Sequence, residues 1–280
     1  MKVVRTVAEL REARAALRGP VGFVPTMGAL HEGHASLMTA ARGESASIVA
    51  SVFVNPTQFG PNEDFTRYPR DESADLAMLE SLGVDLAFLP SVDEMYPSGA
   101  TTYVDVGPVG DVLEGAARPG HFRGVATVVT KLFSMVQPDR AYFGQKDGQQ
   151  SVVVKRLVRD LALPVEIVVC PTVREPDGLA LSSRNRYLTP EERAQAPALD
   201  RALQAASAAA ADGERSADKL RALMLDALAP ATLGKPDYVS IADAETLEEL
   251  SVLDRPALAS LAVRFPSARL IDCEPLVSPR

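Results

Sequence analysis

The stretch PTMGALHEGH, residues 25–34, decides the fold predicted for this chain. It follows an apolar run at 21–24 that is typical of a buried strand, and it precedes residues 35–41, whose apolar positions share one helical face. We therefore predict a strand-to-helix turn. A helix that begins there directs backbone N–H groups and the positive end of its dipole at the turn, which suits an anion such as phosphate.

Two of the three histidines in the chain, His31 and His34, lie in this turn. They are three residues apart and share a face, so both imidazoles can donate to phosphate oxygens. Zinc binding is the alternative, but the metalloprotease helix that Glu32 would suggest needs histidines four residues apart. Because Gly33 also precedes the second histidine, we expect no metal ligands here. Gly28 and Gly33 lack a Cβ and let a ligand approach closely.

The composition narrows the class of protein. The chain has 280 residues, a hydrophobic fraction of 46% and a net charge of −8. This length allows one large or two modest domains, and the negative charge offers no general attraction to nucleic acid or to an anionic membrane. Cys170 and Cys273 lie in apolar surroundings far apart in sequence, which favours reduced core residues in a cytoplasmic protein. The N-terminus lacks the apolar segment of a signal peptide, and the apolar runs are too short to span a membrane.

Strand and helix patterns alternate through the first two thirds of the chain. Strands are predicted at 21–24, 48–54, 85–89, 141–143 and 165–169, with a further extended piece at 102–106. Helices are predicted at 7–17, 71–82, 125–136 and 149–161. This order predicts an α/β fold with a Rossmann-type doubly wound parallel sheet. Ligands of such sheets bind outside the carboxyl ends of the strands, so the 25–34 turn and the 55–60 loop are expected at one edge.

The composition changes near residue 185, which predicts a first domain at 1–184 and a small α+β C-terminal domain at 185–280. A capping box at 189–192 starts a helix that Pro197 is expected to kink, and a second helix covers 217–228. Strands are predicted at 238–241, 257–263 and 269–271. Acidic residues outnumber basic ones in this domain, which argues against a tRNA-binding appendage.

Other residues in the chain can bind phosphate or a polar substrate. Lys146 and Asp147 follow a predicted strand at a helix start, where lysine can reach phosphates; the alternative is a solvated ion pair. The run Leu181-Ser182-Ser183-Arg184 can bind a polyphosphate; the alternative is a serine-rich linker. Gln58 and Gln150 carry amides that can bind a hydroxyl or a carboxylate. The chain lacks a P-loop, a dinucleotide-binding glycine motif and a serine nucleophile elbow.

Five ordered motifs carry a resemblance that covers nearly the whole chain: 25–34, 53–59, 119–125, 143–150 and 181–187. With them the sequence resembles the pantothenate synthetase (pantoate–β-alanine ligase) family. The histidine turn and the serine–arginine loop resemble the paired signatures of the HIGH/KMSKS nucleotidyltransferase superfamily. The resemblance implies that ATP and (R)-pantoate form pantoyl adenylate and pyrophosphate, and that β-alanine then displaces AMP to give pantothenate.

The resemblance also implies the roles of individual residues. His34 takes the position of a proton donor, and His31, Lys146 and Arg184 are the other catalytic candidates. Pantoate is expected at Gln58 and Gln150, and β-alanine also at Gln58. The implied ATP-binding residues are Met27, Gly28, Ala29, Leu30, His31, Glu32, Gly33, His34, Gly144, Gln145, Lys146, Asp147, Val173, Leu181, Ser182, Ser183 and Arg184. Mg²⁺, a homodimer formed through the N-terminal domain, a closing C-terminal lid and a cytoplasmic location are implied as well.

Three positions depart from the pattern of that family. Gln145 stands where the family commonly has Glu, Gly148 where it has a large residue, and Leu181 where it has Met. None is a phosphate donor, so we expect effects on affinity rather than on activity. Two other functions stay open at this point: a nucleotidyltransferase that releases an adenylylated product and stops there, and a non-catalytic nucleotide-binding relative.

Overall fold

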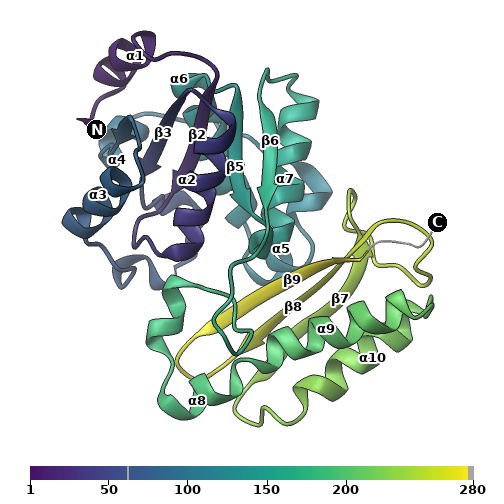
Figure 1. Cartoon of the computed structure of the whole chain (residues 1–280). Coiled ribbons are helices and arrows are strands. Elements are labelled where there is room, and N and C mark those ends of the chain that lie inside the picture. The colour runs from purple at the N-terminus through teal and green to yellow at the C-terminus, as the bar shows by residue number, and fades with distance from the viewer. Residues whose placement is uncertain (62, 277–280) are drawn as a thin grey trace. The chain divides into compact units, whose positions relative to one another are not determined.

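The computed structural model describes residues 1–61 and 63–276, which form two compact units (Figure 1). The first unit comprises Met1–Gly144 and Val153–Cys170, and the second comprises Gln145–Val152 and the chain from Pro171 onward. The boundary expected at residue 184 therefore falls inside the second unit. The reason is long-range packing, because the segments at 145–152 and 171–184 contact the C-terminal sheet, which a change in composition does not reveal.

The first unit is built on a parallel sheet of six described strands in the order β1-β4-β3-β2-β5-β6. The strands are β1 (Lys2–Val4), β2 (Val21–Thr26), β3 (Ser47–Val52), β4 (Leu86–Phe88), β5 (Arg140–Gly144) and β6 (Glu166–Cys170). The helices are α1 (Val7–Ala15), α2 (Glu32–Glu44), α3 (Glu72–Ser81), α4 (Val92–Met95), α5 (Glu114–Ala117), α6 (His121–Val136) and α7 (Gly148–Asp160), which runs on from the second unit. Short 3₁₀ turns are η1 (Pro56–Gln58), η2 (Asp64–Thr66), η3 (Gly107–Gly110) and η4 (Gln145–Asp147). The five predicted strands and the doubly wound α/β class are confirmed.

One strand of the first unit was missed in the sequence analysis. β1 was not predicted, because it has three residues of which two are exposed, and so it shows no hydrophobic run. The piece at 102–106 belongs to no described strand.

Helices cover both faces of this sheet, and β2 shows why. Val24 is buried in one hydrophobic cluster with Leu37 and Met38 of α2. Phe23 packs edge-on against Phe133 of α6, with ring centroids 6.4 Å apart. Because successive side chains of a strand point to opposite faces, α2 and α6 lie on opposite sides of the sheet. A strand covered on both faces needs apolar residues at nearly every position, as 21–24 has.

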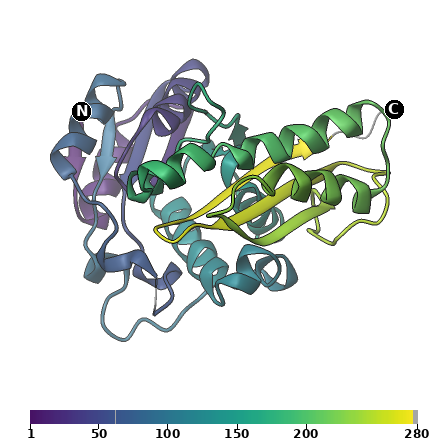
Figure 2. The same cartoon turned by 90° about the horizontal axis from the view of Figure 1, so that it is seen from below.

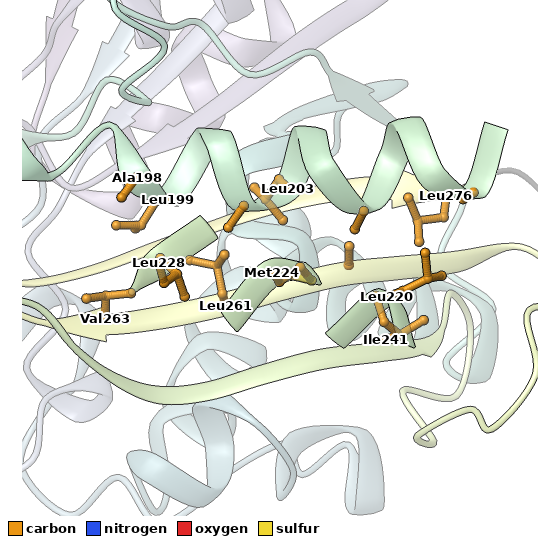
Figure 3. Close-up of a cluster of buried hydrophobic side chains, with 14 of the residues drawn as sticks. Ala198, Leu199, Leu203, Leu220, Met224, Leu228, Ile241, Leu261, Val263 and Leu276 are labelled. Carbon is orange, nitrogen blue, oxygen red and sulfur yellow. The ribbon is translucent and has the colours of Figure 1, made fainter. Parts of the chain in front are cut away.

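The second unit is an antiparallel sheet covered by two long helices. Its strands are β7 (Lys235–Asp243), β8 (Ala257–Arg264) and β9 (Arg269–Leu276), in that order. α9 (Ala198–Ala211) and α10 (Ala217–Leu228) lie along the strands, as Figures 1 and 2 show. Figure 3 shows the core between these two helices and the sheet, where Leu203, Met224 and Leu261 are fully buried. The α+β class predicted for this part is confirmed.

Pro197 separates two helices rather than kinking one. α8 (Pro190–Gln195) starts at the predicted capping box of Thr189 and Glu192, and α9 starts only at Ala198. Proline has no N–H for a helical hydrogen bond and its ring crowds the preceding turn, so the helix stops before it. The expected kink was therefore wrong. The 3₁₀ turn η5 (Ser183–Tyr187) precedes α8 and carries the end of the serine–arginine loop.

We predict that Gly124→Ala destabilises the protein by about 1–3 kcal/mol, because overpacking of this kind typically costs that much. A Cβ at Gly124 of α6 would lie 2.4 Å from the Thr57 carbonyl oxygen and 2.7 Å from the Gln58 Cα, so α6 would have to move away from η1. Gly43→Ala on α2 is the matched control. A Cβ there meets nothing within 4 Å, and a helical alanine is about 1 kcal/mol more favourable than glycine. Urea unfolding of the two variants and the parent measures both effects, and equal stability of the two variants would contradict the prediction.

Candidate active site

A buried carboxylate holds the histidine turn. Asp75 of α3 is 3% exposed, and its oxygens accept hydrogen bonds from the N–H groups of Ala29 at 3.0 Å and Leu30 at 2.7 Å. Gly28 has a φ of +81°, and a Cβ there would lie 2.7 Å from an Asp75 oxygen. The glycine is therefore required both by the backbone conformation and by the carboxylate. The backbone of the turn is thus fixed from α3, a separate element of the same unit.

The two histidines of the turn lie at the start of α2 and together cap its N-terminus. His31 is the N-cap of α2, and its Nδ1 accepts from the N–H of Gly33 at 3.1 Å, while the Nδ1 of His34 accepts from the N–H of His31 at 3.3 Å. The ring proton of each imidazole therefore sits on Nε2 in this geometry. The rings lie side by side with centroids 4.2 Å apart. The N–H groups of Gly33 and His34 both have partners in His31, at its Nδ1 and its carbonyl oxygen.

Gln58, the candidate for pantoate and β-alanine, is held from several sides. Its side chain is 8% exposed, and its Oε1 accepts from the Asn55 amide at 2.9 Å. Its Nε2 lies 3.2 Å from the Met27 Sδ, which brings two of the predicted site residues together. The backbone carbonyl of Gln58 accepts from His121 Nδ1 at 2.8 Å and from Arg118 at 3.3 Å. The amide orientation is thus fixed by its neighbours in the first unit.

His121 is kept neutral by its surroundings. Burial and the nearby charge of Arg118 lower the pKa of His121 from 6.5 to about 4. Nε2 of the ring faces the Arg118 guanidinium at 3.0 Å, so this nitrogen accepts and the proton sits on Nδ1, which donates to Gln58. Arg118 is itself paired with Glu63 at 2.6 Å. A second proton on this imidazole would face the guanidinium directly.

A pocket in the second unit groups three of the predicted phosphate-binding residues. Lys146, Ser182 and Arg184 line it together. The other residues around it are Leu179, Ala180, Asn185, Leu199, Arg269, Leu270, Ile271 and Asp272. Lys146, Arg184 and Arg269 give three cationic side chains around one cavity, next to the carboxylate of Asp272. Cationic side chains grouped in this way suit a polyphosphate.

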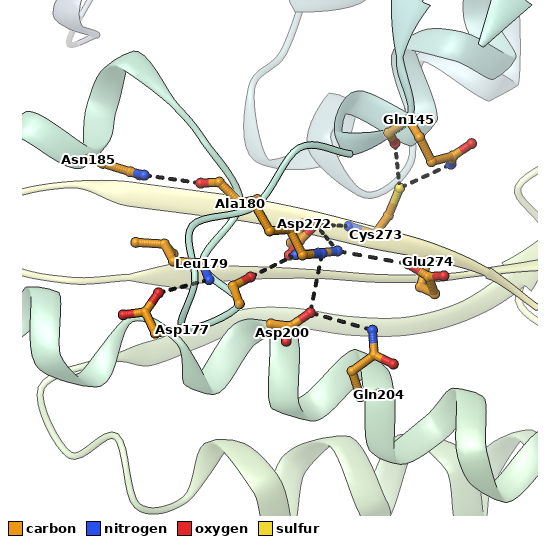
Figure 4. Close-up of polar contacts among 12 residues, drawn as sticks. Gln145, Asp177, Leu179, Ala180, Asn185, Asp200, Gln204, Asp272, Cys273 and Glu274 are labelled. Atoms are coloured by element: carbon orange, nitrogen blue, oxygen red, sulfur yellow. Dashed lines mark hydrogen bonds and ion pairs between the residues drawn. The ribbon is translucent and has the colours of Figure 1, made fainter. Parts of the chain in front are cut away.

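The serine–arginine loop has a defined shape within this unit. Ser182 caps η5, with its Oγ accepting from the N–H of Arg184 at 3.2 Å. The N–H of Leu181 donates to the Val173 carbonyl at 2.9 Å, which ties two predicted ATP-binding positions together. Asn185 donates from its side chain to the carbonyl of Ala180 at 3.0 Å, as Figure 4 shows. The loop is therefore a folded turn rather than an extended linker.

Arg174 joins this loop to the C-terminal sheet. Its guanidinium donates to Asp272 at 2.6 Å and to the Gly178 carbonyl at 3.2 Å, and it pairs with Asp200 at 3.3 Å and Glu274 at 3.8 Å. Burial raises the pKa of the Asp272 carboxyl, and the ion pair with Arg174 opposes that rise. One guanidinium thus holds three carboxylates and a backbone carbonyl in place. Asp272 is the member of this cluster that also lines the pocket of Lys146.

The predicted site residues divide between the two units. Met27–His34, Gln58 and Gly144 belong to the first unit, whereas Gln145–Asp147, Gln150, Val173 and Leu181–Arg184 belong to the second. Within the units the structure groups Met27 with Gln58, His31 with His34, and Lys146 with Ser182 and Arg184. Gln150 lies near the start of α7 and is partly exposed. The binding and catalytic roles of both groups stay predictions.

Several supporting residues were missed by sequence reasoning. They are Asp75, Glu63, Arg118, His121, Arg174, Arg269 and Asp272. Asp75 had a local signal, because a carboxylate four residues before Leu79 lies on the apolar face of its helix. His121 lies within the 119–125 motif, but it was given no role in the sequence analysis. The other residues act through partners distant in sequence and resemble ordinary surface charges.

The described residues show neither a metal cage nor a membrane helix. No group of three or more His, Cys, Asp or Glu side chains among them could hold a metal ion. Within the described ranges, no helix is both long and apolar enough to cross a bilayer. Cys170 and Cys273 are free and buried, as predicted.

The fold and these side chains define a class of protein. A doubly wound parallel sheet, a helix start with two imidazoles, and a pocket of the second unit lined by three cations are suited to a phosphorylated ligand such as a nucleotide. The profile of the family described as "Pantoate-beta-alanine ligase" matches residues 2–274. The chain therefore belongs to the pantoate–β-alanine ligase family. It is a ligase that condenses pantoate with β-alanine in an ATP-dependent reaction.

Similar proteins agree with this membership. The pantothenate synthetase of Chloroflexus aggregans is 62% identical over 273 residues, which cover 97% of this chain and 98% of that protein. A crystal structure of pantothenate synthetase from Thermus thermophilus is 56% identical, with a TM-score of 0.94 over 100% of both chains. A pantoate-β-alanine ligase structure from Francisella tularensis is 35% identical, with a TM-score of 0.79, and covers 98% of this chain and 97% of that one.

We predict that His121 makes the protein less stable in acid. The folded-state pKa of about 4 lies below the ordinary 6.5, so the unfolded chain binds more protons between these values. Stability from this group is complete above pH 6.5 and is lost as the pH falls toward 4, by up to about 3 kcal/mol at 1.36 kcal/mol per pH unit. Urea unfolding at pH 7 and pH 4.5 should show a smaller loss for His121→Asn, which keeps an N–H donor near the position of Nδ1. Equal losses in parent and variant would remove His121 as the cause.

Proposed function

We propose that the chain condenses pantoate with β-alanine in two steps through pantoyl adenylate. In the first step a pantoate carboxylate oxygen attacks the α-phosphorus of ATP, and pyrophosphate leaves with the electron pair of the broken P–O bond. In the second step the β-alanine amine attacks the acyl carbon, AMP leaves with the electrons of the C–O bond, and the amine loses a proton. Neither step needs a protein nucleophile. Orientation of the substrates and stabilisation of charge on phosphate oxygens are sufficient.

The pocket of the second unit carries this proposal. Lys146, Ser182 and Arg184 converge there, and they are residues that the resemblance assigned to ATP. The negative charge in the first step develops on the α-phosphate and on the leaving pyrophosphate, where an ammonium and a guanidinium lower its energy. We assign Lys146 and Arg184 to these oxygens and the Ser182 hydroxyl to a supporting hydrogen bond. Gly144–Asp147, Ser183, Leu181 and Val173 complete the proposed nucleotide contacts.

The histidine turn supplies the other proposed donors. With Nδ1 engaged in both rings, His31 and His34 carry their ring protons on Nε2. We assign both Nε2–H groups to phosphate oxygens, with His34 as the proton donor to the leaving group. Met27 to Gly33 complete the nucleotide contacts proposed for the histidine turn.

Gln58 and Gln150 are the proposed contacts for the organic substrates. The Gln58 Oε1 is occupied by Asn55, so its amide N–H₂ is the end that offers hydrogen bonds to a substrate oxygen. We assign Gln58 and Gln150 to pantoate, and Gln58 also to β-alanine. The Francisella tularensis ligase was crystallised as a complex with "Beta-gamma ATP" and β-alanine, which supports placing both ligands in one protein of this fold.

We propose four further features of the protein. Mg²⁺ would arrive with ATP, because this ion keeps several waters and is usually held by phosphates and one or two carboxylates. We propose that Asp147 is close enough to the phosphates to take part, and that the C-terminal part closes over ATP as a lid. The family resemblance supports a homodimer formed through the N-terminal part. Two free cysteines are consistent with a cytoplasmic location.

Product analysis tests the reaction sequence. With ATP and pantoate alone we expect pyrophosphate but no free AMP, because the adenylate stays bound. Addition of β-alanine should release AMP and pantothenate in equal amounts. An enzyme that releases pantoyl adenylate into solution and makes no pantothenate would instead be a nucleotidyltransferase. A chain that binds ATP without forming pyrophosphate would be a non-catalytic relative.

We predict that Lys146→Ala lowers pantoate-dependent pyrophosphate formation by about 10²–10³-fold, the range found when a charge-stabilising donor is removed. Lys155→Ala is the matched control, because Lys155 lies exposed on α7. Initial rates of pyrophosphate release and circular dichroism spectra of both variants give the comparison. A folded Lys146→Ala variant with the parent's rate would exclude Lys146 from the mechanism.

A further inference from the structure

The loop that carries Lys146 packs against a strand distant in sequence. η4 (Gln145–Asp147) lies on β9, the edge strand of the antiparallel sheet, and both belong to the second unit. Two neighbouring residues of β9 lie close to Lys146 or to the residue before it. Asp272 lines the pocket of Lys146, and Cys273 contacts Gln145 (Figure 4). Because side chains alternate along a strand, these two residues hold the region from opposite faces of β9.

The thiol of Cys273 binds the backbone next to Lys146. Its S–H donates to the carbonyl oxygen of Gln145 at 2.8 Å, and its sulfur accepts from the Gln145 side-chain amide at 3.5 Å. Cys273 is 2% exposed. Burial raises the pKa of this thiol to about 12, so it keeps its proton at neutral pH and can donate it to the carbonyl. The residue that precedes Lys146 is therefore fixed at both its backbone and its side chain by one sulfur atom.

Gly148 provides the space that this sulfur occupies. A Cβ at Gly148 would lie 2.4 Å from the Cys273 Sγ and 3.4 Å from the Cys273 Cβ. The backbone of Gly148 lies outside the left-handed region, so alanine would fit its conformation. What excludes a side chain is therefore the thiol. Gln145 and Gly148 are also the two positions near Lys146 at which the sequence departs from the pattern of the family it resembles.

We infer that Cys273 is a positioning residue for ATP: its thiol, with the space left by Gly148, fixes the Gln145 carbonyl and thereby the direction in which Lys146 points. This inference rests on the proposed role of Lys146 at the phosphates. The Lys146 side chain is flexible but of fixed length. The position of its backbone therefore sets the region in which the ammonium can meet phosphate oxygens. The carboxylate of Asp272, which Arg174 holds in place, lines the same pocket and restricts the positions that the Lys146 ammonium can take.

One set of variants tests the hydrogen bond from Cys273 to the Gln145 carbonyl, and a second set tests the packing of the thiol against Gly148. Cys273→Ala removes the donor, and we expect the KM for ATP to rise about threefold to tenfold, as loss of one buried hydrogen bond predicts, with the KM for pantoate unchanged. Cys273→Ser restores a donor and should bring the KM for ATP back toward the parent value. Cys170→Ala is the matched control for removal of a buried thiol, and it should leave the KM for ATP unchanged.

A double-mutant cycle tests the fit of sulfur and glycine. Gly148→Ala should raise the KM for ATP more than Cys273→Ala does, because the loop has to move away from the sulfur. Gly148→Ala combined with Cys273→Ala removes the clash, so the double variant should match Cys273→Ala. Thermal unfolding of each variant is recorded with the kinetics. The rescue keeps the test informative even where Gly148→Ala alone folds poorly.

Each contrary outcome has a distinct meaning. If Lys146→Ala is inactive while Cys273→Ala keeps the parent's KM for ATP, the inference is overturned and the proposed function stands. A lower melting temperature with unchanged KM values would give Cys273 a structural role only, and this also overturns the inference. If Lys146→Ala matches the parent, the proposed role of Lys146 fails and the inference fails with it.

Discussion

Parallel pairing of β2 with its neighbours is the constraint on which the first unit depends. Thr26 is paired with Val52, so β2 and β3 end side by side and deliver the histidine turn and the 55–60 loop to the same edge. The contact between Gln58 and Met27 follows directly from this register. A slip of one residue in β2 would exchange Phe23 with Val24 between the two faces and lose both cores, so burial fixes the register. Backbone pairing therefore brings together the parts of the candidate site that belong to the first unit, without any contribution from polar side chains.

A second constraint recurs at three candidate segments: a buried or partly buried polar side chain from another element binds the backbone of the segment. Asp75 accepts from the N–H groups of Ala29 and Leu30, His121 donates to the Gln58 carbonyl, and Cys273 donates to the Gln145 carbonyl. Buried backbone groups need such partners in any case, since leaving them unpaired is costly. Each of these segments is therefore held by a side chain from another element as well as by its own side chains. It also explains why the supporting residues differ in chemistry, because a carboxylate suits N–H groups whereas an imidazole or a thiol suits a carbonyl.

The parts that sequence reasoning predicted are those with a local signal. The apolar run at 21–24 and the capping box at 189–192 each act within a few residues, and both were confirmed. β1 has too few residues for a pattern, and the unit boundary depends on pairs such as Arg174 with Asp272 and Gln145 with Cys273, which are 98 and 128 residues apart. No window of sequence contains such pairs. The motifs therefore indicated which side chains could meet a nucleotide, whereas the residues that hold those motifs in place required the fold.

The contacts of Cys273 give a physical reason for the departures near Lys146. The Gln145 amide can donate to the Cys273 sulfur while its carbonyl accepts the thiol proton, whereas a glutamate in the same place would carry a charge into a buried contact and offer no donor. A large residue at 148 could not coexist with the thiol, because even a Cβ would meet it. Gln145, Gly148 and Cys273 thus form one set in which each member suits the other two. Since Lys146 and Asp147 lie within the loop but outside this set, the packing beneath the loop can differ while the groups proposed to meet the phosphates stay the same.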